Sequence, residues 1–147
     1  MDKLSWATVA FMAGAFLPLQ AGLNAKLGKA GGSVIHASMI SFVVGSMALL
    51  LYILITKQTF SWTGLKAAPV QAWVGGLLGA FYVTVIILSF QRLGPGLTFG
   101  LVVAGQMIVS VLLEHFGILV SQPNPINLFR LIGISLVIVG VILIRNF

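Results

Sequence analysis

The chain has 147 residues, of which 59% are hydrophobic and 7% are charged, and its formal net charge is +6. A soluble domain carries roughly 25% charged residues, so this composition excludes one and indicates an all-α integral membrane protein surrounded by a lipid bilayer. The basic residues stand singly between apolar runs, which argues against a nucleic-acid-binding patch, and the lack of cysteine excludes disulfides and thiolate chemistry.

Five stretches of the sequence are apolar and long enough to cross a bilayer, which takes about 20 helical residues. The segments between them contain proline, glycine, asparagine and charged residues, which end helices or prefer water. We therefore expect residues 1–147 to form a single transmembrane domain with five helices. The predicted spans are 4–23, 34–55, 72–90, 97–120 and 128–144.

The first predicted span contains a proline and ends in polar residues. Pro18 removes a backbone hydrogen bond and should kink the helix. Gln20 and Asn24 are four residues apart and therefore lie on one helical face. We expect both side chains to contact a polar solute.

The second and third spans carry small and polar residues at helical spacing. Ser38 and Tyr52 of the second span could line a polar cavity, although serines in membrane helices often bond their own backbone. Gly75 and Gly79 of the third span allow close helix packing. We assign Gly75 and Gly79, with Pro18, to packing and motion.

The fourth span interrupts its apolar sequence with three polar residues on one face, Gln106, Ser110 and Glu114, at positions i, i+4 and i+8. We expect Gln106 and Ser110 to contact the solute and Gly105 to permit helix motion. Between Leu97 and Glu114 the helix rises about 25 Å, less than the roughly 30 Å of hydrocarbon, so Glu114 should lie within the bilayer.

A carboxylate at that depth is costly unless it is protonated, paired or facing water. Glu114, with His115 beside it, could exchange a proton for a cationic group and so couple transport to a gradient. Alternatively, Glu114 is an interfacial charge near His115 and Arg130, and Gln106 merely joins helices by a hydrogen bond.

The basic residues also bear on orientation, because lysine and arginine bias normally fixes it. The eight lysines and arginines divide evenly between the two membrane sides, with Lys3, Lys57, Lys66 and Arg130 on one and Lys26, Lys29, Arg92 and Arg145 on the other. We interpret this tie as dual topology with antiparallel pairing, which brings the partner's Asn24 to the height of Glu114. The alternative is a weakly biased protein that inserts one way with help from a partner.

Catalytic sites are not indicated. One acid within the spans, no cysteine and two histidines on opposite sides cannot assemble a triad, a metal cluster or a carboxylate pair within a protomer. We expect no enzyme activity, no metal and no cofactor.

Several sequence blocks resemble the YdcZ-like branch of the drug/metabolite transporter superfamily. They are "NAKLG", "SFVVGS", "SFQRLGPGLTFGLVVAGQMIVSVLLEHFG" and "RLIGISLVIVGVILI". The resemblance implies a five-helix bacterial inner membrane protein, equivalent to half of the inverted repeat of ten-helix members, that dimerises around a transport path. By position, the family's blocks fall on Asn24, Gly105, Gln106, Glu114, His115, Phe116 and Gly117. Glu114 stands where the family often has aspartate, and the mid-helix glutamate of small multidrug exporters has no counterpart in the first span.

We therefore predict a secondary transporter of a small polar or cationic solute in the bacterial inner membrane. It would work by alternating access in an antiparallel dimer of two copies, or of this chain and a paralogue, with proton exchange as one coupling scheme. The alternatives are a non-transporting membrane scaffold or subunit, and a parallel oligomer that acts as a passive channel.

Overall fold

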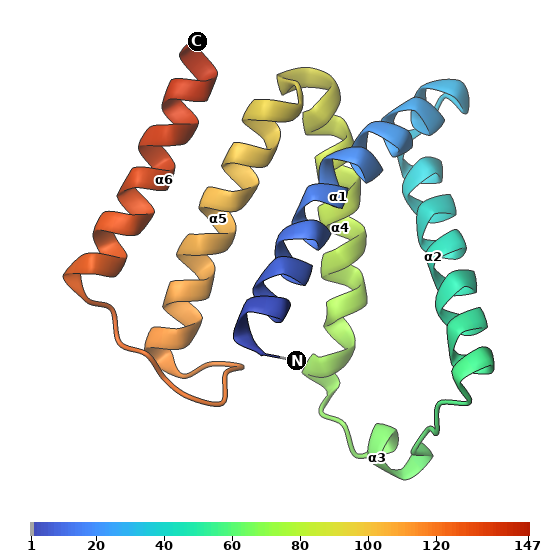
Figure 1. Ribbon diagram of the computed structural model, residues 1–147. Helices are drawn as coiled ribbons and strands as arrows, with labels where there is room; N and C mark the ends of the chain where they lie inside the picture. Colours follow the sequence, from blue (N-terminus) through green and yellow to red (C-terminus); the bar gives the residue numbers. More distant parts are fainter. Residues whose placement is uncertain (1) are drawn as a thin grey trace. The chain divides into compact units, whose positions relative to one another are not determined.

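The computed structural model describes residues 2–147, which form helices joined by short turns and loops (Figure 1). The elements are α1 (Lys3–Ala30), α2 (Val34–Thr56), α3 (Trp62–Lys66), the 3-10 helix η1 (Val70–Trp73), α4 (Val74–Leu93), α5 (Pro95–Phe116) and α6 (Leu128–Asn146). Within the described residues, five helical segments are long and apolar enough to cross a membrane: α1, α2, η1 with α4, α5 and α6. The predicted all-helical, five-span fold is confirmed.

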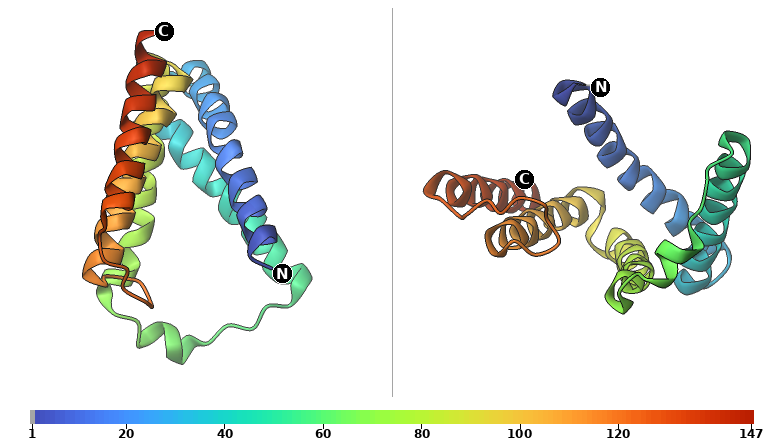
Figure 2. Two further views of the ribbon diagram at one scale, coloured as in Figure 1. Left: turned by 60° about the vertical axis from the view of Figure 1, so that its left-hand side comes forward. Right: turned by 90° about the horizontal axis from the view of Figure 1, so that it is seen from below.

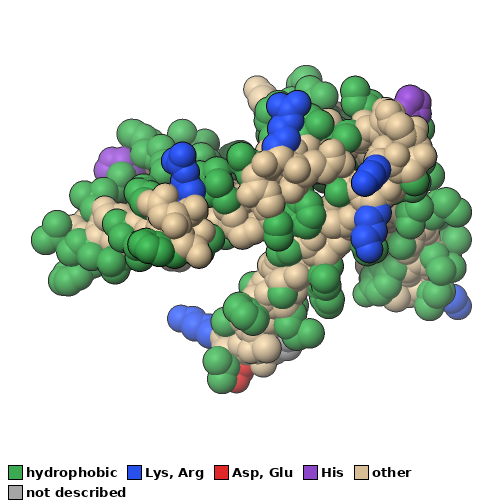
Figure 3. All heavy atoms as spheres, turned by 90° about the horizontal axis from the view of Figure 1, so that it is seen from above, with side chains coloured by type: hydrophobic (Ala, Val, Ile, Leu, Met, Phe, Trp, Pro, Cys, Tyr) green, Lys and Arg blue, Asp and Glu red, His purple; other side chains and the backbone are tan. Residues whose placement is uncertain are grey.

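Apolar side chains lie largely on the outside of these helices. Leu49 is 66% exposed, Leu77 72% and Phe129 82%. Hydrophobic side chains also make up most of the surface seen in Figure 3, with basic side chains in a few places only. Such exposure costs about 25 cal/mol per Å² in water, whereas acyl chains solvate it, so the helices are suited to lipid.

Short polar residues cap three of the spanning helices, α1, α2 and α6, at their amino ends. Asp2 caps α1 by accepting a hydrogen bond from the Ser5 backbone N–H at 2.8 Å, and Asn127 caps α6 by accepting one from the Arg130 N–H at 3.0 Å. The Ser5 hydroxyl also donates to Asp2, and this bond, together with the backbone bond, lowers the pKa of the Asp2 carboxyl below its usual value. The side chain thus holds the first turn of α1 in its charged form.

The predicted span 97–120 is wrong at its carboxyl end. The helix ends at Phe116 because Gly117 adopts a left-handed conformation, with φ of 65°, and its N–H bonds the carbonyls of Leu113 and Glu114. Glycine pays no Cβ penalty in this conformation, so it is a common helix stop. Glu114 consequently lies in the last turn of α5.

Two other predicted spans differ from the structure. Span 4–23 is too short, because α1 continues to Ala30. Span 72–90 starts within the spanning segment, which is formed by η1 and α4 together, but it ends three residues short of Leu93. The spans 34–55 and 128–144 agree with α2 and α6 to within a turn. The short helix α3 was not predicted, because its five residues are too few to show a helical pattern of apolar residues.

The chain divides into two compact units, of which the first ends at Gln91 and the second spans Arg92–Phe147. In the first unit α1 packs against α2 after a tight turn, and in the second α5 packs against α6, as Figures 1 and 2 show. The single-domain organisation of residues 1–147 stays a prediction.

Glycines on α5 allow its close contact with α6. A Cβ at Gly100 would lie 3.1 Å from Val141, and one at Gly96 would lie 3.4 Å from Ile144. These two glycines have the small-xxx-small spacing that lets membrane helices approach. The glycine pair predicted from the sequence in the third span has this same spacing.

The residues predicted for packing and motion have different surroundings. A Cβ at Gly79 would lie 3.5 Å from the Phe42 ring, an ordinary van der Waals distance, so α4 contacts α2 here without requiring glycine. In the part of the chain that the structure describes, Gly75 and Gly105 have nothing within 4 Å of such a Cβ, so neither packs closely against a helix of its own unit. Helix α1 runs through Pro18 without interruption, and the kink stays a prediction.

Candidate functional site

A crevice of about 250 Å³, lined by apolar groups and three polar side chains, lies in the first unit among α1, α2 and α4. Its lining includes Gln20, Ser41, Phe42, Gly45, Ser46 and Val83. Helix α2 rises about 18 Å between its start and Ser46, which places this part of the crevice near the middle of a roughly 30 Å hydrocarbon layer. Of the predicted solute-contacting residues, Gln20 lines the crevice directly.

Asn24 acts on the crevice through a neighbour. Its side chain is buried, with 7% exposed, and its Nδ2 donates to Ser41 Oγ at 3.1 Å. This hydrogen bond joins α1 to α2 and holds a lining hydroxyl in place. Asn24 is therefore placed to position Ser41, and a solute would meet Ser41 first.

Ser38 forms a second polar link, in this case between α2 and α4. Its hydroxyl donates to the Val34 carbonyl at 3.0 Å and accepts from Thr84 Oγ1 at 3.0 Å, and the residue is 4% exposed. The structure thus shows the self-bonding alternative that the sequence left open. Tyr52 is 59% exposed and is not among the residues that line the crevice.

Three polar residues in or near the crevice were not predicted as site residues from the sequence: Ser41, Ser46 and Thr84. Ser41 follows Ser38 by nearly one turn, so its place on the same stripe was visible, but not its hydrogen bond to α1. Thr84 is a lone polar residue in an apolar run, a signal too weak to assign.

In the second unit, the polar face of α5 is open. Gln106 and Ser110 are both exposed on α5, four residues apart. A primary amide that faces hydrocarbon without a partner costs several kcal/mol, on the order of 2–7. This face therefore calls for water or for a protein partner.

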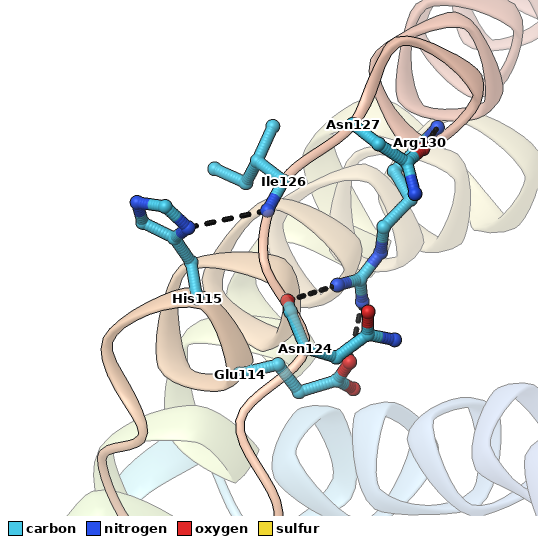
Figure 4. A network of polar contacts seen from close by, with 6 residues as sticks. All are labelled: Glu114, His115, Asn124, Ile126, Asn127 and Arg130. Carbon is cyan, nitrogen blue, oxygen red and sulfur yellow. Dashed lines mark hydrogen bonds and ion pairs between the residues drawn. The ribbon is translucent and has the colours of Figure 1, made fainter.

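Glu114 is paired with Arg130 (Figure 4). Arg130 Nη2 donates to Glu114 Oε2 at 2.5 Å, and the two side chains are 36% exposed for Glu114 and 19% for Arg130. Arg130 Nη1 also donates to the Asn124 carbonyl at 2.6 Å, and the Asn124 N–H donates to the Glu114 carbonyl at 2.9 Å. The network ties the end of α5, the following loop and the start of α6 together.

His115 belongs to the same network but points to a different partner. Its Nδ1 accepts a hydrogen bond from the Ile126 N–H at 3.2 Å (Figure 4). A backbone N–H can only donate, so Nδ1 is unprotonated in this arrangement and the ring carries its proton on Nε2. Through this hydrogen bond His115 anchors the loop.

The depth of the ion pair follows from the length of α5. The helix rises about 28 Å from Pro95 to Glu114, which places the carboxylate at the edge of a roughly 30 Å hydrocarbon layer. The pairing with Arg130 agrees with the interfacial alternative that the sequence left open, and the coupling role of Glu114 stays a prediction.

Comparison with known proteins gives a consistent result over most of the chain. A family model described as "Putative inner membrane exporter, YdcZ" matches residues 5–143. The chain is 32% identical over 113 residues to "Inner membrane protein YdcZ" of Escherichia coli (strain K12), covering 74% of this chain and 75% of that protein. No solved structure matches the chain.

Proposed function

The chain belongs to the YdcZ family of inner membrane proteins described as exporters, and from this premise we propose that it is a secondary transporter of a small polar or cationic solute. Its five apolar helices agree with a location in the bacterial inner membrane. A transporter family also favours transport over enzymatic chemistry.

The observation that supports this proposal most directly is the crevice among α1, α2 and α4. By helical rise its Ser46 hydroxyl lies near mid-membrane depth, where polar side chains commonly mark the path of a solute. The crevice, at about 250 Å³, is below the roughly 300–1,000 Å³ of drug-sized sites, so the solute would be small. Gln20, Ser41 and Ser46 would bind it, with Asn24 positioning Ser41.

A dimer would account for the open polar face of α5. A second copy, inverted in the membrane, would cover Gln106 and Ser110 and place its own polar helix opposite them. The even division of basic residues between the two sides is what such dual insertion requires. Rocking of one protomer against the other would then open the path to each side in turn.

The Glu114–Arg130 pair suggests how coupling would work. The Glu114 side chain is 36% exposed, so a proton or a cationic group can reach it. In the proposed cycle, either one replaces Arg130 at the carboxylate and frees the start of α6 to move. A purely structural pair would leave coupled transport unchanged when Glu114 is replaced.

The transport proposal is tested with protein reconstituted in liposomes. A panel of small amines, amino acids and polyols is first screened for solutes that raise the thermal unfolding midpoint, and the best is then followed in flux assays under an imposed pH gradient. We expect accumulation against its gradient, lost in Ser46→Val and Glu114→Gln. The matched control is Ser135→Val, because among the described residues the Ser135 hydroxyl bonds only the Leu131 carbonyl of its own helix.

The outcomes separate the alternatives. Flux that only follows the solute gradient would indicate a passive channel, and no flux for any stabilising solute would indicate a scaffold. Undiminished coupled transport in Glu114→Gln would remove Glu114 from the coupling step while leaving the crevice in place.

Orientation needs a separate experiment. Reporters that are active on only one side of the membrane are fused to the carboxyl terminus of the chain. Dual topology predicts signal from both kinds of reporter, whereas signal from a single kind would exclude an antiparallel homodimer.

A further inference from the structure

A second and larger cavity, of about 850 Å³, lies where α1 ends, α2 begins and α4 ends. All of its lining residues belong to the first unit. Its walls include Lys26 and Lys29 of α1, Ser33 and Val34 at the start of α2, and Phe90 and Gln91 of α4. It is separate from the crevice described above, since the two share no lining residue.

Within the described part of the first unit, no acidic side chain balances the charge of this cavity. Lys26 and Lys29 are nearly one turn apart on α1 and both line the cavity. The chain has only two acidic residues. Asp2 lies at the opposite end of α1, about 36 Å away by helical rise, and bonds Ser5. Glu114 is paired with Arg130, so neither acid neutralises the two lysines.

The rest of the wall is ordered and largely apolar. Gln91 Nε2 donates to the Ala25 carbonyl at 3.3 Å, which fixes the end of α4 against α1. The Phe90 ring lies on the inner side of this contact, 3.4 Å from where a Gly22 Cβ would be. The cavity therefore combines two cationic groups with an aromatic and aliphatic wall.

We propose that this cavity binds a phosphate ester that carries an apolar group. The phosphate would lie between Lys26 and Lys29, where charge-assisted hydrogen bonds are strongest, and the apolar group would pack on Phe90 and Val34. The cavity, at about 850 Å³, falls within the roughly 300–1,000 Å³ of organic-ligand sites. Because three spanning helices begin or end here, the site lies at the membrane surface, where an anionic phospholipid and a soluble organic phosphate can both reach it. The site does not depend on the proposed transport.

Binding is measured on the full chain, purified in an uncharged detergent, as a shift in the thermal unfolding midpoint. The probes are phenyl phosphate, inorganic phosphate, and micelles that contain either phosphatidylglycerol or phosphatidylcholine. Lys26→Gln with Lys29→Gln removes the cationic pair, and Lys57→Gln with Lys66→Gln removes the same charge elsewhere. Lys26→Arg with Lys29→Arg keeps the charge in place, and the two single glutamine variants replace the double one if it does not fold.

We expect phenyl phosphate or phosphatidylglycerol to raise the midpoint in the wild type, in the Lys57/Lys66 control and in the arginine variant. Loss of the Lys26/Lys29 pair should weaken the apparent affinity about tenfold or more. A shift with phosphatidylglycerol alone identifies a lipid headgroup as the ligand, and a shift with phenyl phosphate identifies a soluble phosphate ester. No shift with either probe, an equal shift in the Lys26/Lys29 glutamine variant, or equal potency of inorganic phosphate would overturn the proposal.

Discussion

Arg130, in the first turn of α6, donates to the carboxylate of Glu114, in the last turn of α5, at 2.5 Å. Each residue stands at the helix end that disfavours its charge, because a helix dipole is positive at its amino end and negative at its carboxyl end. The ion pair offsets both penalties at once. It also closes the loop between the two helices, since the same guanidinium holds the Asn124 carbonyl.

Removal of one partner should therefore cost more than removal of both. We expect a coupling energy of about 1–2 kcal/mol for this partly exposed pair, between the values typical of exposed and buried ion pairs. The measurement is a double-mutant cycle of Glu114→Gln and Arg130→Gln, followed by unfolding in mixed micelles. Lys66→Gln, at the exposed carboxyl end of α3, serves as a control. Strictly additive effects of the two substitutions would show that the ion pair contributes no stability.

Glycine at position 100 should be required for the contact between α5 and α6. A Cβ there would lie 3.1 Å from Val141, whereas one at Gly140 would meet open space in the described chain. Gly100→Ala should destabilise the protein by about 1–2 kcal/mol through overpacking. Gly140→Ala should be neutral or stabilising by about 0.5–1 kcal/mol, as expected for glycine in a helix interior.

The same unfolding assay checks this prediction. Val141→Ala should partly rescue Gly100→Ala by making room for the added methyl group. Equal changes in the free energy of unfolding for Gly100→Ala and Gly140→Ala would contradict the close approach of α5 and α6 at Gly100.

Asp2 should cap α1 in a pH-dependent way. Hydrogen bonds from the Ser5 hydroxyl and backbone N–H lower the pKa of its carboxyl, so the folded first turn favours the charged form. The stabilisation is present above the carboxyl's ordinary pKa and is lost as the pH falls through the lowered value. Hydrogen exchange at the first-turn amides of α1 should report this loss of protection. Asp2→Asn should keep the cap and remove the pH dependence, whereas Asp2→Ala should fray the turn at every pH.

The spans could be predicted from the sequence, but their contacts could not. Long apolar runs separated by glycine, proline and charge identify membrane helices without reference to tertiary structure. In lipid, however, the packed and the lipid-facing sides of a helix are both apolar, so no periodicity marks which face meets a neighbour. The hydrogen bond between Asn24 and Ser41 and the contact of Gly100 with Val141 depend on that choice of face.

The candidate site, too, could be predicted from the sequence only in part. Gln20 and Asn24 were predicted together because four-residue spacing places them on one face, and both lie at or beside the crevice. Their partners on α2 and α4 required the fold. Glu114 and Arg130 were both noted in the sequence, but their pairing depends on the loop after Gly117, whose left-handed turn brings the chain back toward α5.

A final prediction concerns whether the exposed face of α5 meets water. It can be tested by thiol labelling, because the chain has no cysteine and an introduced thiol is therefore the only one present. Maleimides react with the thiolate, which forms in water and not in hydrocarbon. If the face carrying Gln106 and Ser110 lines a wet path between protomers, Gln106→Cys and Ser110→Cys should be labelled in intact membranes. Leu101, which is 49% exposed and lies on the opposite side of the helix from Ser110, provides the matched control, and Leu101→Cys should stay unlabelled. Labelling of Gln106→Cys and Ser110→Cys should also fall when a transported solute is added. Three equally unreactive thiols would mean that this face is dry, and the polar groups of α5 would then serve only to join helices.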